Sequence, residues 1–439
     1  MPGIIGFYPF GEGRENWDAS RFLYYGLTAL QGRGEACTSI ALLESESKKI
    51  NIYKDNTHVE EFYKRLSENK VRGFIGIGQV SPNEDDGLIE VKEPIRLVLA
   101  GDGKPGYQGN RVEAFYKLAQ RLSTLLTERE DPLDAATQII KEAGIGFSFV
   151  ALTEREEMIC CRDPFGVKPL EVGAVGFDLG IVSSESAALD VVGAVHSGPI
   201  QAGECVVFDP LSIRRRNIPN SESRAYCAFE YVYLARVDSL LNDMPIYNVR
   251  ERIGEILAEE KEAEGDVVIG IPETALPFAL GYSNKTSIPV KLGFMRTGRH
   301  IRSALKPTQF ERIMGVQLKL NPIKAAVDGK DIILIDDSVV RGNTLKNTVL
   351  NLRRKGAKRV HVRVGSPAII SHCPFGTEVP PIDELIGRAL SEEEIAEIIG
   401  ADSFAYLSIE GLLKAIGLPR DRLCLGCFTS EYPNKEVRK

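Results

Sequence analysis

DIILIDDSVVRGNT, running from Asp331 to Thr344, is the stretch of sequence that decides the fold. Ile332 to Ile335 form a short apolar run typical of a strand buried in a parallel sheet. Two carboxylates, Asp336 and Asp337, follow this strand directly, and a polar turn then leads into a helix-like segment. Because open parallel sheets bind ligands where a strand's carboxyl end meets the next helix, this junction is the candidate binding site.

The turn itself suits a phosphate group. It has hydroxyls at Ser338 and Thr344, a flexible Gly342 and a helix start, where backbone N–H groups converge and the dipole is positive. The two acids need a different ligand, and ribose hydroxyls with Mg²⁺ nearby are the natural candidates. A plainer alternative is that the acids and hydroxyls merely cap a helix.

The complete string resembles the signature with which type I phosphoribosyltransferases bind phosphoribosyl pyrophosphate (PRPP). Asp336 and Asp337 would hold the ribose hydroxyls, in the vicinity of Mg²⁺, and the following turn would hold the 5-phosphate. The PRPP-binding residues that the resemblance implies are Asp336, Asp337, Ser338, Val339, Val340, Arg341, Gly342, Asn343 and Thr344.

Length and composition indicate a two-domain globular protein. The chain has 439 residues, of which 43% are hydrophobic and 26% charged, and its net charge is −7. This balance argues against a dedicated nucleic-acid or anionic-membrane binder. No apolar run approaches the roughly 18 residues of a membrane span, and the start lacks the features of a signal peptide, so we expect a cytoplasmic protein.

The pattern of elements changes near the middle of the chain. Up to about Asp209, short strands are broken by Gly, Pro and Asn turns and joined by a few helices, which indicates an α+β sandwich. From about Glu230, strands and helices alternate, which indicates βαβ units and a parallel sheet. The charged segment from Leu211 to Arg224 is the candidate linker, so we expect domains at residues 1–215 and 225–439.

From end to end the chain resembles the amidophosphoribosyltransferase (glutamine-PRPP amidotransferase) family of purine biosynthesis. Residues 30–34, LQGRG, are similar to the family's L-Q-H-R-G, and residues 162–170 and 184–190 match two further motifs of its first domain. The resemblance implies a class II glutamine amidotransferase domain, an Ntn-hydrolase-like αββα sandwich, followed by an α/β type I phosphoribosyltransferase domain with a parallel sheet.

The glutaminase site departs from the family pattern at its nucleophile. The family has a cysteine directly after the initiator Met, whose thiolate attacks the glutamine amide. This chain has Pro2 there, and proline has no nucleophilic side chain. We therefore expect no catalytic residue in the glutaminase site.

Two further positions of that site have changed. The family's G-H-V-R-Y, whose Arg holds the glutamine carboxylate, reads Gly78 to Pro82 here, so the cationic clamp is missing. The family's H-N-G, which supplies the oxyanion hole, reads Gly101-Asp102-Gly103, and an ionised Asp would repel a developing oxyanion. The first domain is thus expected to keep its fold without glutaminase activity.

The phosphoribosyltransferase loops are only partly kept. The family's pyrophosphate loop, P-D-S-G, becomes Pro272 followed by Glu273, Thr274 and Ala275, and an added methyl group can narrow the room for a diphosphate. In the mobile loop that closes over PRPP, Arg302 is the residue that clearly persists in register. Closure of this loop excludes water and couples the glutaminase site to the PRPP site. Because the loop has changed, we do not expect efficient coupled synthesis.

Four of the eight cysteines form the metal signal of the sequence. Cys424 and Cys427 make a CxxC pair, and Cys227 and Cys373 fall where one branch of the family supplies its other ligands to a [4Fe-4S] cluster. Four thiolates suit either Fe–S or zinc, and spacing alone does not decide between them. The resemblance favours a structural cluster; four unrelated core cysteines are the alternative.

Two functions of different class follow. In the first, the chain is an enzyme that binds PRPP and forms 5-phosphoribosylamine from PRPP and ammonia. In the second, it is a non-catalytic regulatory or structural subunit that binds PRPP or a purine nucleotide and pairs with an active homologue. We accordingly expect a homo-oligomer or a hetero-oligomer with such a homologue, and no nucleic-acid or membrane partner.

Overall fold

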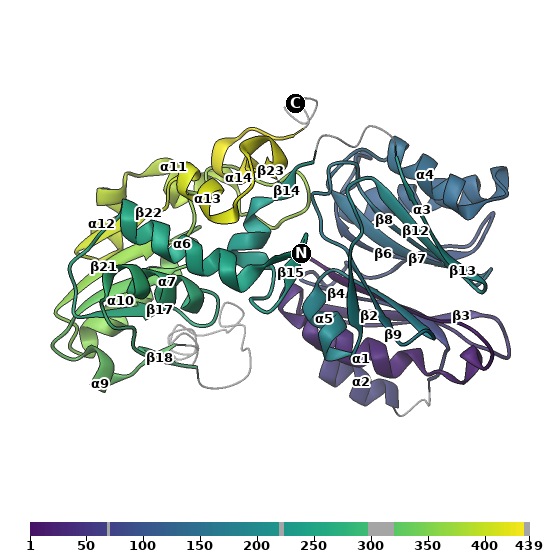
Figure 1. The fold of residues 1–439 in the computed structure, drawn as a ribbon, viewed down its shortest axis with the longest axis horizontal. Coiled ribbons are helices and arrows are strands. Elements are labelled where there is room, and N and C mark those ends of the chain that lie inside the picture. The colour runs from purple at the N-terminus through teal and green to yellow at the C-terminus, as the bar shows by residue number, and fades with distance from the viewer. Residues whose placement is uncertain (68–70, 219–223, 297–319, 434–439) are drawn as a thin grey trace.

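The chain folds into two halves that lie side by side (Figure 1). The computed structural model describes residues 1–67, 71–218, 224–296 and 320–433. The purple and blue half holds two stacked sheets, and the green and yellow half holds a smaller sheet among helices. The N-terminus lies between the two halves, and the described ranges contain no helix long and apolar enough to cross a membrane.

The first half is built on two antiparallel sheets. One has seven strands in the order β11 (Val195–Pro199), β9 (Glu171–Val175), β10 (Leu179–Ser183), β1 (Gly3–Pro9), β4 (Ile75–Ser81), β2 (Cys37–Leu43) and β3 (Ile50–Asp55). The other has six, in the order β13 (Ser212–Asn217), β12 (Glu204–Asp209), β8 (Met158–Arg162), β7 (Phe147–Thr153), β6 (Leu97–Gly103) and β5 (Ile89–Val91).

The two sheets and the helices on their outer faces form four layers, with apolar side chains packed between the layers. A core that includes Ile4, Ile77 and Val150 fills the space between the sheets. The outer face of the first sheet is covered by α1 (Ala19–Ala29), α2 (Val59–Ser67) and α5 (Ser186–Val191), and that of the second by α3 (Arg111–Glu128) and α4 (Pro132–Glu142). The expected αββα sandwich is confirmed.

The second half is built on a parallel sheet with the order β17 (Val267–Gly270), β20 (Asp331–Asp336), β21 (Arg359–Val364) and β22 (Ser403–Tyr406). Its strands are almost wholly buried, which explains their continuous apolar sequence. The helices packed around it are α6 (Ile246–Glu260), α7 (Leu276–Thr286), α10 (Asn343–Arg354), α12 (Glu392–Ile399) and α13 (Ile409–Ile416). The expected α/β domain with a parallel sheet is confirmed.

Short elements complete this half. They are β14 (Tyr226–Cys227), a π-helical turn (Glu230–Leu234), β15 (Leu240–Leu241), β16 (Met244–Pro245), β18 (Phe294–Met295), β19 (Asn321–Pro322), α9 (Lys324–Val327), α11 (Ile386–Ala389), β23 (Leu423–Cys424) and α14 (Gly426–Thr429), with 3₁₀ turns at 382–384 and 420–422. Two further 3₁₀ turns, at 14–16 and 31–33, lie in the first half.

The prediction that Leu211 to Arg224 form a linker is wrong for the first half of this segment. Residues Ser212–Asn217 form β13, which pairs with β12 along its whole length. Its basic side chains point outward from an edge strand and meet acids of neighbouring elements; Arg214, for example, binds Asp131 at 2.8 Å. Charged residues on an edge strand discourage pairing with other chains, which explains the linker-like composition. The proposed domain boundary at residue 215 therefore falls inside a strand.

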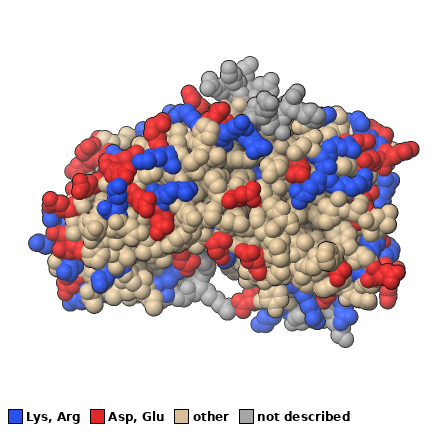
Figure 2. Space-filling model, viewed as in Figure 1, with Lys and Arg blue, Asp and Glu red and all other residues tan. Residues whose placement is uncertain are grey.

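Charged side chains are dispersed over the face of the molecule drawn in Figure 2. On the face in Figure 2, acidic and basic side chains alternate over both halves, without a field of one sign. The two halves themselves are joined by apolar packing, because one buried cluster includes Ile145 and Val167 together with Phe375 and Tyr226.

Candidate active site

The two adjacent acids lie at the carboxyl end of β20, the second strand of the parallel sheet. The Asp337 N–H donates to Asp336 Oδ1 at 3.0 Å, and the Ser338 hydroxyl donates to Asp337 Oδ1 at 2.7 Å. Both side chains are half-buried. The sheet edge therefore presents a pair of carboxylates where an open parallel sheet binds its ligands.

Their surroundings oppose ionisation. Burial and the neighbouring carboxylate raise the pKa of Asp336, and burial raises the pKa of Asp337 to about 6, against lowering contributions from the Ser338 hydroxyl and the Arg250 guanidinium. Two like charges at adjacent positions are costly without a cation or hydroxyl donors between them. A cation or hydroxyl donors bound at this pair would therefore stabilise its charged form.

The turn after the acids ends in the open N-terminus of α10. Gly342 is the N-cap residue, with φ +73°, and no side chain caps the helix. The alternative that the acids and Ser338 serve as a helix cap is therefore wrong. Unpaired N–H groups and the positive end of the helix dipole make a site for an anion such as a phosphate.

The loop expected to hold pyrophosphate lies beside the acids. It joins β17, the neighbouring strand, to α7, and the Thr274 side chain acts to lower the pKa of Asp337. Glu273 forms an exposed ion pair with Arg296 at 3.1 Å, and Ala275 is fully buried at the start of α7. The Pro272–Glu273 peptide is cis. Arg302, expected in the mobile loop, lies outside the described residues.

Two residues of this site were missed in the sequence, Tyr233 and Arg250. Burial and the charges of Asp337 and Asp336 raise the pKa of Tyr233. Arg250 is buried in α6, where it donates to the Tyr231 carbonyl at 3.0 Å and to the Ala235 carbonyl at 2.6 Å. Neither has a local sequence signal, because each reaches the site through tertiary packing.

Comparison with known proteins agrees with this geometry. Residues 236–365, which include the acid pair and both loops, match the phosphoribosyl transferase domain. Over 99% of its length the chain is 35% identical to the amidophosphoribosyltransferase of Methanocaldococcus jannaschii, 98% of which is covered. The chain belongs to the amidophosphoribosyltransferase family. The Bacillus subtilis family member is 33% identical, with 95% of this chain and 92% of the relative covered.

Solved structures of the family share the whole fold. The B. subtilis glutamine PRPP amidotransferase complexed with ADP and GMP superposes with a TM-score of 0.87, at 31% identity, over 98% of this chain and 97% of that one. A second structure, described as the allosteric regulatory enzyme of purine biosynthesis, gives a TM-score of 0.86 at 31% identity. The class II glutamine amidotransferase domain and the phosphoribosyltransferase domain are therefore both present.

Arg33, in the stretch LQGRG that matches the family's L-Q-H-R-G, lies beside Pro2 and binds three buried carboxylates. Its guanidinium binds Glu185 at 2.9 Å and Glu230 at 2.8 Å, and lies 3.5 Å from Asp102; its Nε donates to the Pro2 carbonyl at 3.3 Å. All five residues are buried. Burial acts to lower the pKa of Arg33, but the three carboxylates outweigh it and raise that pKa.

Residues in and near the altered Gly78–Pro82 and Gly101–Gly103 motifs are also hydrogen-bonded within the protein. The Gln79 amide donates to the Ser81 hydroxyl at 2.9 Å and accepts from the Gly101 N–H at 2.9 Å. Arg111, which the sequence did not single out, pairs with Asp86 and donates to the Gly103 carbonyl at 2.9 Å. The Gln79 amide and the Arg111 guanidinium are therefore both held by partners inside the protein.

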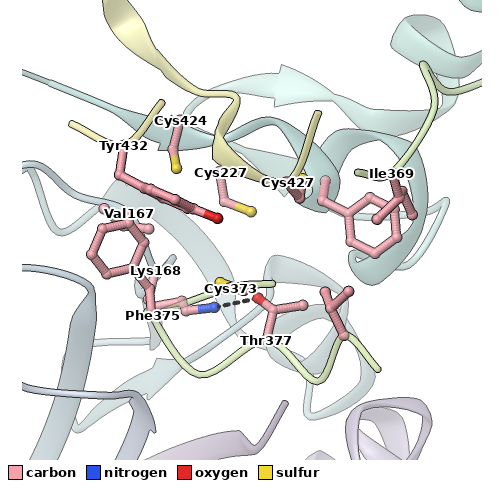
Figure 3. Close-up of a pocket in the computed structure, with 12 residues that line it drawn as sticks. Val167, Lys168, Cys227, Ile369, Cys373, Phe375, Thr377, Cys424, Cys427 and Tyr432 are labelled. Atoms are coloured by element: carbon pink, nitrogen blue, oxygen red, sulfur yellow. Dashed lines mark hydrogen bonds between the residues drawn. The ribbon is translucent and has the colours of Figure 1, made fainter. Parts of the chain in front are cut away.

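All four expected cluster cysteines line one pocket at the junction of the halves (Figure 3). Cys227 and Cys424 face each other in the parallel pair β14–β23, and Cys373 and Cys427 complete the lining. Aliphatic and aromatic side chains line most of the rest, together with Lys168, which donates to the Thr377 hydroxyl at 3.0 Å. Burial raises the pKa of Cys227 to about 12 and also raises the pKa of Cys424 and Cys427.

The eight cysteines fall into two groups of four. The four outside the pocket lie in the first half, and the positions of the four pocket cysteines limit which metal group they can hold. Cys37, Cys160, Cys161 and Cys205 are buried in the sheets of the first half, as core packing requires. Within the described ranges, no group of three or more Cys, His, Asp or Glu could hold a single metal ion. The four thiols thus surround a common space without converging on one ion position.

Proposed function

We propose that this chain binds PRPP and Mg²⁺ at the end of β20 and forms 5-phosphoribosylamine from PRPP and ammonia, without glutaminase activity of its own. The observation that carries the proposal is the combination of Asp336 and Asp337 with the uncapped start of α10 and the adjacent Glu273–Ala275 loop. Each part meets a different group of PRPP: ribose hydroxyls, 5-phosphate and pyrophosphate.

The chain's own residues account for the binding steps. The two carboxylates accept hydrogen bonds from the ribose hydroxyls and so fix the ring. The N–H groups at the start of α10 hold the 5-phosphate. Ammonia then forms the new C1–N bond while the C1–oxygen bond to pyrophosphate breaks, and the extra proton passes to solvent.

The donor set at this site fits Mg²⁺. Carboxylate and phosphate oxygens are the ligands that Mg²⁺ prefers, and the acid pair carries charge that the described protein groups compensate incompletely, as its raised pKa values indicate. Asp336 and Asp337 would lie near the ion. When bound, Mg²⁺ supplies charge neutralisation for the departing pyrophosphate.

Pro2, Asp102 and Arg33 support the loss of glutaminase activity. Pro2 replaces the nucleophile, and Asp102 replaces an oxyanion donor with a carboxylate. Arg33 is tied to Glu185 and Glu230, so its charge is already compensated. The nitrogen source is therefore free ammonia or a separate ammonia-producing protein.

The four-cysteine pocket fits a [4Fe-4S] cluster better than zinc. A cluster is several ångströms across and its ligands stand apart, whereas a zinc site draws four sulfurs to about 2.3 Å from one ion. Cys227, Cys373, Cys424 and Cys427 line a common pocket without forming a single-ion site. The cluster would be structural, joining β14 to the C-terminal segment.

A regulatory role is the second candidate, and the pyrophosphate loop favours it. Glu273 is already paired with Arg296, and the Ala275 methyl group occupies buried space where the family has glycine. A subunit of this kind would bind PRPP or purine nucleotides and act on an active homologue. The B. subtilis structure with ADP and GMP supports nucleotide binding as a property to test here.

The deciding experiment measures pyrophosphate release from PRPP with Mg²⁺ and ammonium. Turnover by the pure protein that disappears in the Asp336→Asn/Asp337→Asn variant supports the enzyme. No pyrophosphate release by the pure protein, together with a changed rate of release by an active homologue when the protein is added, supports the regulatory subunit instead. Glutamate formed from glutamine by the pure protein would overturn the loss of glutaminase activity.

A further inference from the structure

The buried ion cluster of Arg33, Asp102, Glu185 and Glu230 crosses the junction between the two halves. Arg33, Asp102 and Glu185 belong to the first half, whereas Glu230 begins the π-helical turn of the second. Arg33 holds Glu230 through both terminal guanidinium nitrogens, at 2.8 and 3.1 Å. Each of these side chains is at most 3% exposed, so the contacts are shielded from solvent and salt.

The same cluster holds the far end of the segment that Glu230 begins. Glu185 Oε2 accepts from the Arg236 N–H at 2.7 Å and from the Ser239 hydroxyl at 2.8 Å. Arg236 also donates to the Ala29 carbonyl of the first half at 3.2 Å. Residues 230–239 are therefore attached to the first half at both ends.

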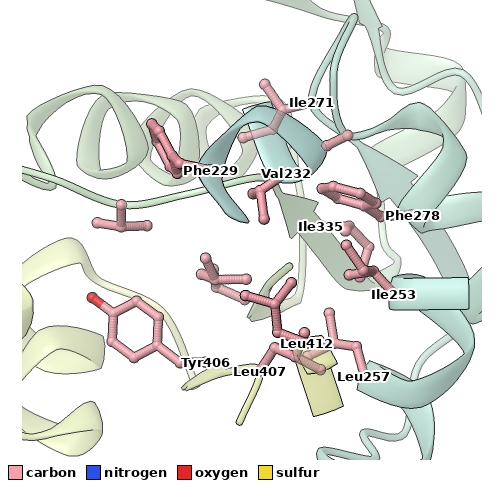
Figure 4. Close-up of a cluster of buried hydrophobic side chains, with 14 of the residues drawn as sticks. Phe229, Val232, Ile253, Leu257, Ile271, Phe278, Ile335, Tyr406, Leu407 and Leu412 are labelled. Carbon is pink, nitrogen blue, oxygen red and sulfur yellow. The ribbon is translucent and has the colours of Figure 1, made fainter. Parts of the chain in front are cut away.

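The middle of this segment is packed against the PRPP site. Val232 and the preceding Phe229 lie in one buried cluster with Ile271 and Ile335, which stand at the ends of β17 and β20 (Figure 4). Ile335 directly precedes the acid pair. Arg250, which donates to two carbonyls of the segment, also lies close enough to Asp337 to lower its pKa.

Tyr233 lies on the outward side of the same turn. Its side chain is 46% exposed, while its neighbours Tyr231 and Val232 are buried. Its pKa is raised by burial and by the charges of Asp337 and Asp336. The segment that the ion cluster holds therefore carries a partly exposed phenol next to Val232, which packs in the same buried cluster as Ile335.

We propose that the ion cluster in the former glutaminase pocket is a positioning site for PRPP binding: Arg33, through Glu185 and Glu230, fixes residues 230–239 and so places Tyr233 and Arg250 at the acid pair. This inference rests on the proposed PRPP binding. Within it, the pocket that no longer hydrolyses glutamine keeps a task, because its charges set the geometry of the second site. Arg33, Glu185 and Glu230 are positioning residues, since they act through the segment.

The test is a set of conservative variants with two readouts. Glu230→Gln keeps the shape and removes the charge that Arg33 holds, and Ser239→Ala removes one hydrogen bond to Glu185 while leaving the ion cluster whole. We expect Glu230→Gln to weaken Mg²⁺-PRPP binding about tenfold and Ser239→Ala to weaken it less, by calorimetry. Amide hydrogen exchange of residues 230–239 should accelerate in both.

Arg14→Met is the matched control. Arg14 is partly buried in the first half, where it pairs with Glu156 and donates to the Tyr8 hydroxyl. Neither partner belongs to residues 230–239. We expect it to lower the melting temperature while PRPP affinity and exchange of the segment stay as in the wild type. A purely structural role for Glu230 would make the two variants alike in affinity.

Two results would overturn the inference. One is a folded Glu230→Gln protein with wild-type PRPP affinity and wild-type exchange in residues 230–239. The other is loss of affinity in proportion to lost stability in every variant, including Arg14→Met. If the wild-type protein binds no PRPP, the proposed function fails, and hydrogen exchange alone still decides whether the cluster fixes the segment.

Discussion

Asp336 and Asp337 put two like charges on the same strand end, and the consequence is a pH-dependent site. Because burial raises the pKa of Asp337 to about 6, and that of Asp336 is raised as well, acidification protonates the groups that must accept ribose hydroxyls. We expect the Kd for Mg²⁺-PRPP to rise at least fivefold between pH 7.5 and pH 5. Calorimetry across this range checks it; a constant affinity would contradict the assigned roles.

The same pair should destabilise the free protein at neutral pH. A raised folded-state pKa means that the folded chain binds more protons than the unfolded chain between about pH 4 and 6, so stability falls as pH rises through that window. Since both acids are partly exposed, we expect Asp337→Asn to raise the free energy of unfolding by only about 1–2 kcal/mol at pH 7. Thermal unfolding at pH 7 and pH 4 measures the difference, which should vanish at pH 4.

Individual residues were predictable where a local motif carried them. The string from Asp336 to Thr344 was recognised because strand, acids and turn are consecutive in sequence. Tyr233 and Arg250 were not, since an arginine inside a helix reads as a surface charge until tertiary packing buries it. Asp102 stands out in the sequence by its position in the altered H-N-G motif, but its contact with Arg33 has no sequence signal, because the two residues are 69 positions apart.

At the scale of elements, the turn into α10 depends on one glycine. Gly342 has φ +73°, and an added Cβ would meet Ile386 Cδ1 at 3.1 Å. Because other residues adopt this backbone at a cost of roughly 1–2 kcal/mol, we expect Gly342→Ala to lose about that much stability and also PRPP affinity. Denaturant unfolding and PRPP calorimetry measure the two effects.

Gly329→Ala separates the backbone cost from the effect on the ligand. Gly329 has φ +71°, has open space where its Cβ would lie, and precedes β20 at the opposite end from the acids. It should therefore lose similar stability and keep its PRPP affinity. Equal loss of affinity in both glycine variants would mean that α10's start has no direct part in binding.

Elements followed from periodicity when one face was buried. Helices α3 and α4 and strand β7 are of this kind, because their apolar residues recur at helix or strand spacing. Residues Ser212–Asn217, in contrast, form β13 although their composition is that of a linker. An edge strand with exposed polar residues lacks a buried pattern to read.

At the scale of the molecule, the junction is where the two halves depend on each other. Met1 contacts Lys168 of the first half and Thr377 of the second, and Phe375 packs over Gly146. The ion cluster and the cysteine pocket lie along this same junction. No sequence pattern predicts such an arrangement, because it pairs residues more than a hundred positions apart; only the family resemblance indicated where the cysteines meet.

The cysteine pocket gives the last prediction. If the four thiols hold a [4Fe-4S] cluster, Cys424→Ser should lose a brown chromophore, and β14, β23 and the segment around Cys373 should separate, because the ligands come from three regions of the second half. We expect a melting temperature lower by at least about 5 °C, since a loss of 1 kcal/mol shifts a domain of this size by roughly 2–4 °C. Limited proteolysis should then cut between residues 371 and 380.

Cys37→Ser is the control for that measurement. Cys37 is fully buried in β2, away from the pocket, so the exchange places a hydroxyl in the core at a cost of about 1–3 kcal/mol without touching a cluster ligand. This variant should keep the chromophore and resist proteolysis at residues 371–380 even at reduced stability. Stoichiometric zinc in the wild type, or a chromophore that survives Cys424→Ser, would exclude the cluster and leave the four thiols to be explained as a metal-free or zinc-bound junction.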